Sequence, residues 1–343
     1  MGAAITAPIV DVHGMVPGPC GQPRAEGSGL GHHRCMDDRL RQRAHRQGGV
    51  FTSQDVRDLL LSDLCLRSSV RRGEAIRLRR DAYVLAQTWR EARPSERLAL
   101  RSRAVLRTRP GDVASHQSAV ALHGLPCWGM PVDVVDLYAR VRRTHTVAGV
   151  RTHPRPDDVE ADDVDGAACV DVATAIAQVA QRHGLVPALI ALDPALHERI
   201  CRLSQVQAAV ARVARSRSER TRLEQIVARA DASCESVGET RTRVLLQDLG
   251  YEVRSQVTIS DVDGLRVGRV DFLIGELLVV EFDGMVKYEG ADGREALARE
   301  KAREERLSCL GCVVVRLVWA DLDHPERVQG MIETALRRIS QRR

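Results

Sequence analysis

The pattern of apolar and polar positions divides the chain into stretches of different character. Residues 1–35 are rich in Gly, Pro, Ala and His and show no apolar period, so we predict a disordered leader there. A helical pattern begins directly after Met36, which makes this methionine an alternative translation start. The folded part of the chain is therefore expected to begin at residue 36.

Residues 36–90 show three short helical patterns followed by two strand patterns. Paired glycines end the first helix, and Thr52 followed three residues later by Asp55 fits an N-cap with its acidic partner. Strict alternation then predicts a two-stranded ribbon. Three helices and a ribbon are typical of a winged helix-turn-helix. The predicted elements are a helix at 37–47, a helix opened by Thr52, a helix at 64–72, and strands at 76–79 and 81–85.

Arginine is concentrated in this first part of the chain. The whole chain carries a net charge of +5, but residues 36–150 alone hold 21 arginines against 12 acidic residues. Six arginines fall on the predicted third helix and the ribbon, which are the parts that touch DNA in winged helices. We predict contact with duplex DNA, and the alternative is a solvated arginine face. The six are Arg67, Arg71, Arg72, Arg77, Arg79 and Arg80.

Residues 91–231 are predicted to be a mainly helical middle region with a small β element. The strand patterns cover 132–139 and 144–152. His116 and His123 lie seven residues apart, on one face of a helix. Because nothing near them completes a ligand set, we expect this pair to be structural.

From residue 232 to residue 343 the pattern changes to helix, three strands, helix and strand. This alternation predicts an α/β domain. The first helix closes at Gly250, and a turn-rich stretch follows the first strand. The predicted helices are 239–249 and 295–310, and the predicted strands are 251–259, 267–274, 276–282 and 312–319.

Carboxylates interrupt two of these apolar strands. Asp271 lies in the middle of one and Glu281 ends the next, and such acids are costly unless they bind a cation or a partner. Glu281 and Asp283 project from the same face of one strand, and Asp271 joins them if its strand is adjacent. Glu239 on the preceding helix could add a fourth group. Oxygen ligands of this kind predict a Mg²⁺ or Mn²⁺ site.

Lysine is rare in this chain, and its two positions lie close to the acidic strands. The 51 basic residues include only Lys287 and Lys301. A lysine beside a metal can hold or deprotonate the attacking water, or stabilise charge on a pentavalent phosphate, so both are catalytic candidates together with Asp271, Glu281 and Asp283. The alternative is that the carboxylates pair with arginines such as Arg269 or Arg303, without a metal.

Four sequence motifs occur in order within residues 232–325. They are Val270-Asp271-Phe272, then Val280-Glu281-Phe282-Asp283-Gly284 with Lys287-Tyr288, then Glu300-Lys301-Ala302-Arg303-Glu304, and finally Val315-Arg316-Leu317. Together they resemble the DUF559 domain of the restriction-endonuclease-like PD-(D/E)xK superfamily, close to the very-short-patch repair endonucleases. The resemblance implies that Asp271 and Glu281 hold the metal and that Glu239 is the acid of the first helix. The superfamily pattern has Glu-x-Lys where this chain has Glu281-Phe282-Asp283, so lysine would have to come from Lys287 or Lys301.

A second resemblance concerns the N-terminal part. The residues on which this resemblance rests are Gly49-Val50-Phe51-Thr52, Val70-Arg71-Arg72-Gly73, Leu78-Arg79-Arg80-Asp81-Ala82-Tyr83-Val84, Ser115-His116-Gln117-Ser118-Ala119 and Leu122-His123-Gly124-Leu125-Pro126. They are similar to the winged-helix antitoxin proteins of AbiEi type, from type IV toxin–antitoxin systems. This resemblance implies a DNA-binding regulator with a cognate toxin as partner.

Composition excludes several other classes of protein. No apolar run reaches the roughly 18 residues of a membrane helix, and the start has no basic head with an apolar core, so we expect neither a span nor a secretory signal. Nine irregularly spaced cysteines indicate reduced thiols and a cytoplasmic protein, with Cys309 and Cys312 as buried residues and not zinc ligands. Aromatic residues make up only 3%, which argues against single-strand binding by base stacking.

The predicted fold class is multidomain. An all-α winged helix-turn-helix and a helical middle region precede an α/β restriction-endonuclease-like domain. Two functions are compatible with this architecture. The first is a Mg²⁺-dependent DNA endonuclease that its winged helix delivers to duplex DNA. The second is a non-catalytic, antitoxin-type transcriptional regulator whose nuclease fold binds DNA without cutting it.

Overall fold

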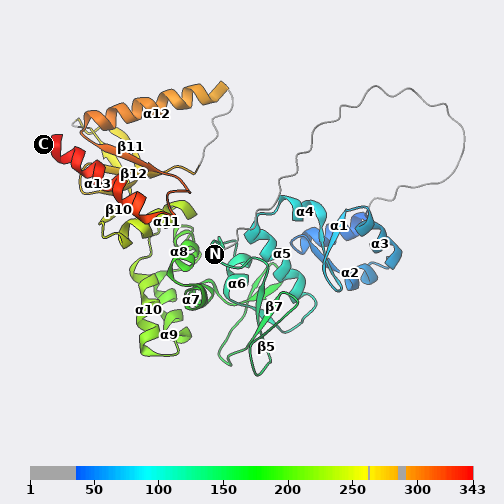
Figure 1. Ribbon diagram of the computed structural model, residues 1–343. Helices are drawn as coiled ribbons and strands as arrows, with labels where there is room; N and C mark the ends of the chain where they lie inside the picture. Colours follow the sequence, from blue (N-terminus) through cyan, green and yellow to red (C-terminus); the bar gives the residue numbers. More distant parts are fainter. Residues whose placement is uncertain (1–35, 262, 285–290, 343) are drawn as a thin grey trace, which may run out of the picture. The chain divides into compact units, whose positions relative to one another are not determined.

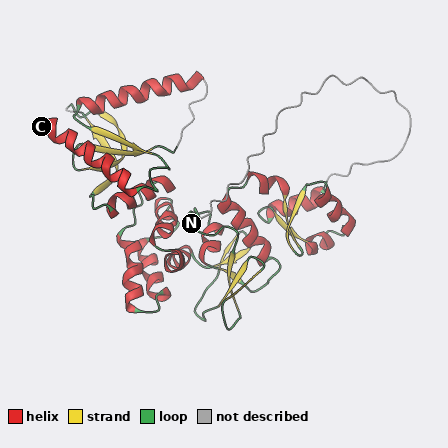
Figure 2. Ribbon diagram, viewed as in Figure 1, coloured by secondary structure: helices red, strands yellow, loops and turns green. Residues whose placement is uncertain are grey.

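The computed structural model describes residues 36–261, 263–284 and 291–342 (Figure 1). The leader predicted at residues 1–35 and the candidate Lys287 lie outside the described residues. The chain has mixed α/β content, with both helices and strands in its first, middle and C-terminal segments (Figure 2). Among the described helices, none combines the length and the apolar character needed to cross a membrane.

The first segment contains three helices and a small sheet, followed by a fourth helix. Its elements are α1 (Asp38–Arg46), β1 (Val50–Thr52), α2 (Ser53–Asp58), α3 (Asp63–Arg71), β2 (Ala75–Arg79), β3 (Ala82–Leu85) and α4 (Ala86–Glu91). The predicted N-cap is confirmed, because the Thr52 hydroxyl accepts from the Asp55 N–H at 3.2 Å and Asp55 Oδ2 accepts from the Thr52 N–H at 2.7 Å. The all-α prediction is wrong here: β1 adds to the ribbon and gives a three-stranded sheet of order β1-β3-β2.

The middle segment holds a six-stranded sheet, which is more strand structure than the sequence predicted. Its strands are β4 (Val113–Ala114), β5 (Val135–Ala139), β6 (His145–Val147), β7 (Val150–Pro154), β8 (Asp162–Val164) and β9 (Ala167–Cys169), in the order β6-β7-β5-β4-β9-β8. The predicted strand 144–152 is the β6–β7 hairpin, and β7 pairs in parallel with β5. Strands of two or three residues show too little alternation to be predicted.

Helices cover this sheet and build the core of the middle segment. They are α5 (Pro94–Leu106), α6 (His116–Leu122), α7 (Val172–His183), α8 (Leu185–His197), α9 (Leu203–Val213) and α10 (Arg217–Ala228). α7 packs against α6, α8 and α9, and its Ile176 and Val179 are fully buried. α7 is therefore the centre of this core. Each such buried side chain contributes roughly 1.5–3 kcal/mol to stability.

The C-terminal segment follows the predicted order of helix, three strands, helix and strand, with one more helix. Its elements are α11 (Val237–Asp248), β10 (Val253–Ser260), β11 (Arg266–Ile274), β12 (Leu278–Phe282), α12 (Ala291–Cys309), β13 (Val313–Leu317) and α13 (Pro325–Arg342). The strand order is β10-β11-β12-β13, antiparallel except for the parallel pair β12 and β13. Parallel neighbours need a crossover, and α12 provides it. The sequence did not predict α13.

Helices cover both faces of this four-stranded sheet. Leu246 of α11 and Ile332 of α13 share a core with Phe272 on one face. Leu307 of α12 shares a second core with Val279 on the other face. Figure 1 shows α12 running alongside β11 and β12. A carboxylate on the α12 face is therefore held between the sheet and a long, charged helix.

A buried ion pair joins α8 to α11. Arg243 is 1% exposed, and its Nη2 donates to Asp193 Oδ2 at 2.7 Å. The Thr240 hydroxyl and the Asp231 N–H also donate to the Asp193 carboxylate. This pair fixes the C-terminal segment onto the helices of the middle segment.

The prediction that Cys309 and Cys312 are both buried is confirmed for one of them. Cys312 is buried, but Cys309 is exposed, in the last turn of α12.

Candidate functional site

Five of the six predicted DNA-contacting arginines are exposed. They are Arg67, Arg71, Arg72, Arg77 and Arg80. Arg67 and Arg71 lie on α3, and neither makes an ion pair with a described residue. Arg72 is bound internally, because its Nη2 lies 3.0 Å from Glu74 Oε2. The α3 arginines thus present positive charge to solvent, which phosphate contact requires.

Arg79 differs from the other five. The pairing register of β2 with β3 shifts between Arg77 and Arg79, so the alternation that predicted an outward side chain is broken there. Arg79 Nε and Nη1 are buried, and neither atom has a hydrogen-bond partner in the described part of the chain. Burial, together with the charge of nearby Arg109, lowers the pKa of Arg79 below its usual value. Arg79 is therefore half-buried, with its Nε and Nη1 held inside the protein, whereas the other five arginines are exposed.

The acidic strands of the C-terminal segment are neighbours, which is the condition that the predicted metal site depended on. β11 pairs with β12 so that Phe272 lies opposite Val280. One step further along each strand places Asp271 opposite Glu281. Like charges directly opposite each other destabilise a sheet unless something neutralises them. The structure therefore brings together the two carboxylates that were predicted to hold a metal.

Asp271 is the more weakly compensated of the two. Its Oδ2 accepts a hydrogen bond from the Phe282 N–H at 2.9 Å. Burial raises the pKa of Asp271 to about 6; the Phe282 N–H opposes this rise, and the carboxylates of Glu239 and Glu281 add to it. Within the described residues it forms no ion pair. A cation beside Asp271 would stabilise its charged form.

Glu281 is bound by two arginines. Arg303 of α12 donates from Nη2 to Glu281 Oε1, and Arg316 of β13 has its Nε 3.6 Å from Oε2. Arg303 can reach this position because a Cβ at Gly268 would lie 2.8 Å from its Nε. The pairing with Arg303 is the one that the metal-free alternative predicted, whereas Arg269 pairs elsewhere. Glu281 thus already has counter-charges in the structure.

The remaining predicted site residues lie further out. Glu239 stands in the first turn of α11, where it accepts hydrogen bonds from Ser236 Oγ at 2.8 Å and from Gln256 Nε2 at 2.9 Å. Asp283 is exposed just after β12, and Lys301 is exposed on α12. Glu239 therefore serves as a helix-capping residue close to Asp271, and Lys301 does not enter the sheet.

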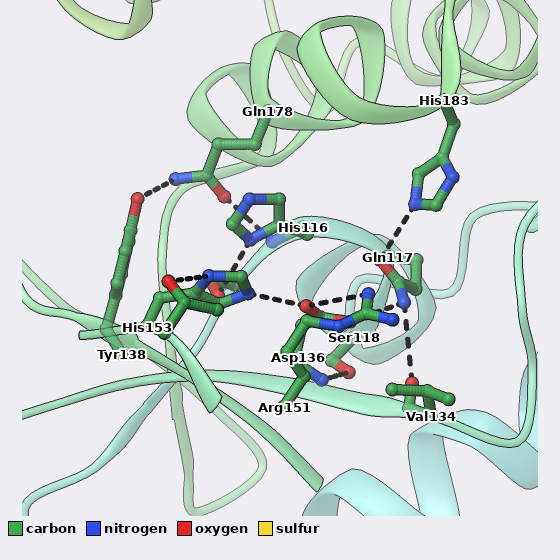
Figure 3. Close-up of polar contacts among 12 residues, drawn as sticks. His116, Gln117, Ser118, Val134, Asp136, Tyr138, Arg151, His153, Gln178 and His183 are labelled. Atoms are coloured by element: carbon green, nitrogen blue, oxygen red, sulfur yellow. Dashed lines mark hydrogen bonds and ion pairs between the residues drawn. The ribbon is translucent and has the colours of Figure 1, made fainter. Parts of the chain in front are cut away.

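A different group comes from the middle segment. Among the described residues, one set of His, Cys, Asp or Glu side chains has all its ligand atoms within 4.8 Å of one another: His116 of α6, Asp136 of β5 and His153 of β7 (Figure 3). All three are buried. His153 Nε2 lies 2.6 Å from Asp136 Oδ1. This group could hold a metal ion.

A hydrogen-bonded shell fixes each member of the buried group. Gln117 Nε2 donates to Asp136 Oδ2 at 2.5 Å. The His116 N–H donates to Gln178 Oε1 at 2.7 Å, and Gln178 in turn donates to the Tyr138 hydroxyl. Figure 3 shows Gln178 reaching down from α7 to the rings. The backbone of His116 has a φ of +51°, a left-handed conformation that a side chain rarely adopts without such support.

Electrostatics prepare this group for a cation or for proton transfer. Burial lowers the pKa of His116 to about 3, so its ring is neutral at pH 7. Burial alone would raise the pKa of Asp136, but the hydrogen bond with His153 and the nearby charges lower it below its usual value. The rings of His116 and His153 stack with planes 25° apart. Two imidazoles on one ion point at a common centre, so coordination would require one ring to turn.

The sequence did not predict this group, and the expectation that nothing completes a ligand set around His116 is wrong. The partners come from two strands that lie 20 and 37 residues later, and only the fold unites them. The neighbouring His123 is structural as expected, since its Nε2 bonds to the Val170 carbonyl. A signal was present: Asp136 lies in an apolar strand, which is the same feature that singled out Asp271.

Comparisons with known proteins add no family. No protein-family model matches the chain, and no curated protein matches it. The function must therefore be argued from the residues and their geometry.

Proposed function

We propose that this protein binds duplex DNA through α3 and the wing, which is the β2–β3 hairpin, and that its C-terminal domain hydrolyses phosphodiester bonds with Mg²⁺ or Mn²⁺. The observation that carries the proposal is the cross-strand pair of Asp271 and Glu281. Arg303 and Arg316 neutralise Glu281, but Asp271 forms no ion pair among the described residues, so a cation beside Asp271 would relieve the repulsion between the two carboxylates. The order of helix, three strands, helix and strand supports the resemblance to restriction-endonuclease-like domains.

The donor set fits a hard divalent cation. Asp271 offers oxygens that have a single N–H partner, and Glu281 lies beside it, so two carboxylates would hold the ion while water and phosphate fill its other positions. Such an ion lowers the pKa of bound water and stabilises charge on the phosphate. Glu239 fixes the start of α11 beside the pair. Arg303 holds Glu281 in place and adds positive charge where a phosphate would approach.

A non-catalytic function has its own support. Arg303 and Arg316 already neutralise Glu281, and Asp283 occupies the position where the resembling superfamily has lysine. In this second candidate function the protein is an antitoxin-type regulator that binds DNA without cutting it. Its partner is then a cognate toxin. The metal response of the C-terminal domain separates the two functions.

The first test measures metal binding and cleavage together. We expect Mg²⁺ or Mn²⁺ to raise the melting temperature of the wild type and to support plasmid nicking. At a metal concentration of 100 times the Kd, the free energy of unfolding should rise by about 2.7 kcal/mol. Asp271→Asn should abolish both effects, because it removes the charge at nearly constant shape. Lys287→Ala and Lys301→Ala should keep the metal response, and the lysine that serves catalysis should lose only the nicking.

Asp263→Asn is the matched control, since Asp263 is an exposed acid in the turn before β11. It should leave both the metal response and the nicking unchanged. A wild-type protein that shows neither a metal-dependent melting shift nor nicking with either ion would favour the non-catalytic regulator.

The second test measures DNA binding by the first segment. Replacing Arg71 and Arg72 with alanine should weaken binding to duplex DNA and reduce the slope of log K against log salt by about 0.9 for each phosphate that the variant no longer neutralises. Fluorescence anisotropy at several salt concentrations gives both values. Arg217→Ala combined with Arg220→Ala on α10 removes the same charge elsewhere and should change neither. An unchanged slope in the Arg71 and Arg72 variant would show that the DNA lies on another surface.

A further inference from the structure

A cavity of about 470 Å³ lies between the wing, α5 and the β5–β7 part of the middle sheet. Its charged lining is strongly one-sided: four arginines against the single acid Asp133. The rest of the lining is apolar and includes Val135 and Val150, whose side chains are buried. Cavities of this size and character are typical of small-molecule sites. The four arginines are Arg79, Arg80, Arg101 and Arg109.

Three of these arginines have partners in the protein. Arg101 Nη1 donates to the Val132 carbonyl at 2.7 Å. Arg109 Nε lies 2.5 Å from Asp112 Oδ2. Arg80 is 89% exposed, with its Nε 3.5 Å from Asp81. Each of these three guanidinium groups therefore has a hydrogen-bonding or ion-pair partner in the protein.

Arg79 is the exception. Its Nε and Nη1 are buried without a hydrogen-bond partner among the described residues. Arg109 is close enough to act on it as a like charge. Arg79 itself is half-buried. Two buried N–H groups next to a second cation are costly, because they have lost their hydrogen bonds to water and Arg79 has no ion pair among the described residues. An anion in the cavity would provide both.

We propose that this cavity binds a small organic anion. Its phosphate or carboxylate group would accept hydrogen bonds from Arg79 and gain the charge of Arg109. Its apolar part would lie against Val135 and Val150. The planar guanidinium offers two parallel N–H donors, which match the two oxygens of either group. Because Arg79 belongs to β2 and Arg109 follows α5, the bound anion would also join the wing to the middle segment.

Phenyl phosphate is a suitable probe, since it combines the anionic group with an apolar ring. Isothermal titration calorimetry of the full chain should show saturable binding, and the melting temperature should rise with the probe concentration. Inorganic phosphate, which lacks the apolar part, should bind more weakly. Arg79→Met should weaken phenyl phosphate binding about tenfold or more, because it removes a charge-assisted hydrogen bond while it keeps the apolar length.

Arg77→Met is the matched control: it removes the same charge two residues earlier on the same strand, from an exposed side chain. It should leave probe binding unchanged. A second readout needs no ligand, because removing a half-buried charge whose Nε and Nη1 are unpartnered among the described residues should make Arg79→Met melt above the wild type. Arg79→Lys keeps a charge at the site and should retain part of the binding, which separates removal of the anion's partner from loss of the fold.

The source of the anion is distinguished by competition with a short DNA duplex. A duplex that displaces the probe identifies a DNA phosphate as the anion, and a duplex that leaves the probe bound identifies a free organic anion. The proposal is overturned if phenyl phosphate shows no saturable binding to the wild type. It is equally overturned if Arg79→Met and Arg77→Met bind the probe as tightly as the wild type does.

Discussion

Arg243→Met is expected to lower the free energy of unfolding by about 3–5 kcal/mol. Asp193 is fully buried, and Arg243 is its only cationic partner among the described residues. Removal of the guanidinium leaves a buried carboxylate with only the Thr240 hydroxyl and the Asp231 N–H as donors. Breaking one side of a buried pair is costly because the remaining charge cannot return to water. Urea denaturation measures the change.

Two further variants distinguish an uncompensated charge from a loss of packing. In Asp193→Leu combined with Arg243→Met no charge stays buried, so the double variant should be more stable than Arg243→Met alone. Arg220→Met removes one partner of an exposed pair with Glu224 on α10, and it should cost less than about 1 kcal/mol. Equal losses in Arg243→Met and in the double variant would show that packing of the long side chain carries the stability.

The C-terminal sheet could be predicted because its strands are long enough to show their pattern. β11 has nine residues, and Asp271 interrupts an otherwise apolar inner stretch. The neighbouring strand ends in Glu281, and the site was predicted on the condition that the two strands are adjacent, which they are. One contact of the site could not be predicted from the spacing of residues: Gly268 leaves room for Arg303 to cross β11 and bind Glu281. A contact from a crossover helix depends on packing, and packing is not periodic.

The other differences have equally physical causes. Arg79 was predicted to contact DNA because it lies on the predicted ribbon, but the register shift in β2 leaves it half-buried, with its Nε and Nη1 inside the protein. His116, Asp136 and His153 meet because β5 and β7 pair in parallel, with Tyr138 opposite His153. Parallel pairing joins residues that are distant in sequence. The chemistry of each residue was readable from the sequence, whereas its partners required the fold.

Mild acid is expected to destabilise the protein through His116. Burial lowers the pKa of this ring to about 3 in the folded protein, while an unfolded histidine titrates near 6.5. Above pH 6.5 the ring is neutral in both states and has no effect. As the pH falls from 6.5 toward 3, only the unfolded state takes up the proton. The free energy of unfolding should then fall by about 1.4 kcal/mol for each pH unit, or about 5 kcal/mol over the window.

His116→Asn should remove this part of the pH dependence. Asparagine has no proton to gain, and it tolerates the left-handed backbone at this position better than other residues do. Denaturation from pH 7.5 to pH 4, with EDTA present so that no metal masks the ring, should give a flatter curve for the variant. His145→Gln removes an exposed histidine and should follow the wild type. Parallel curves for His116→Asn and the wild type would mean that the buried ring accepts its proton in the folded protein, with Asp136 as the counter-charge that makes this possible.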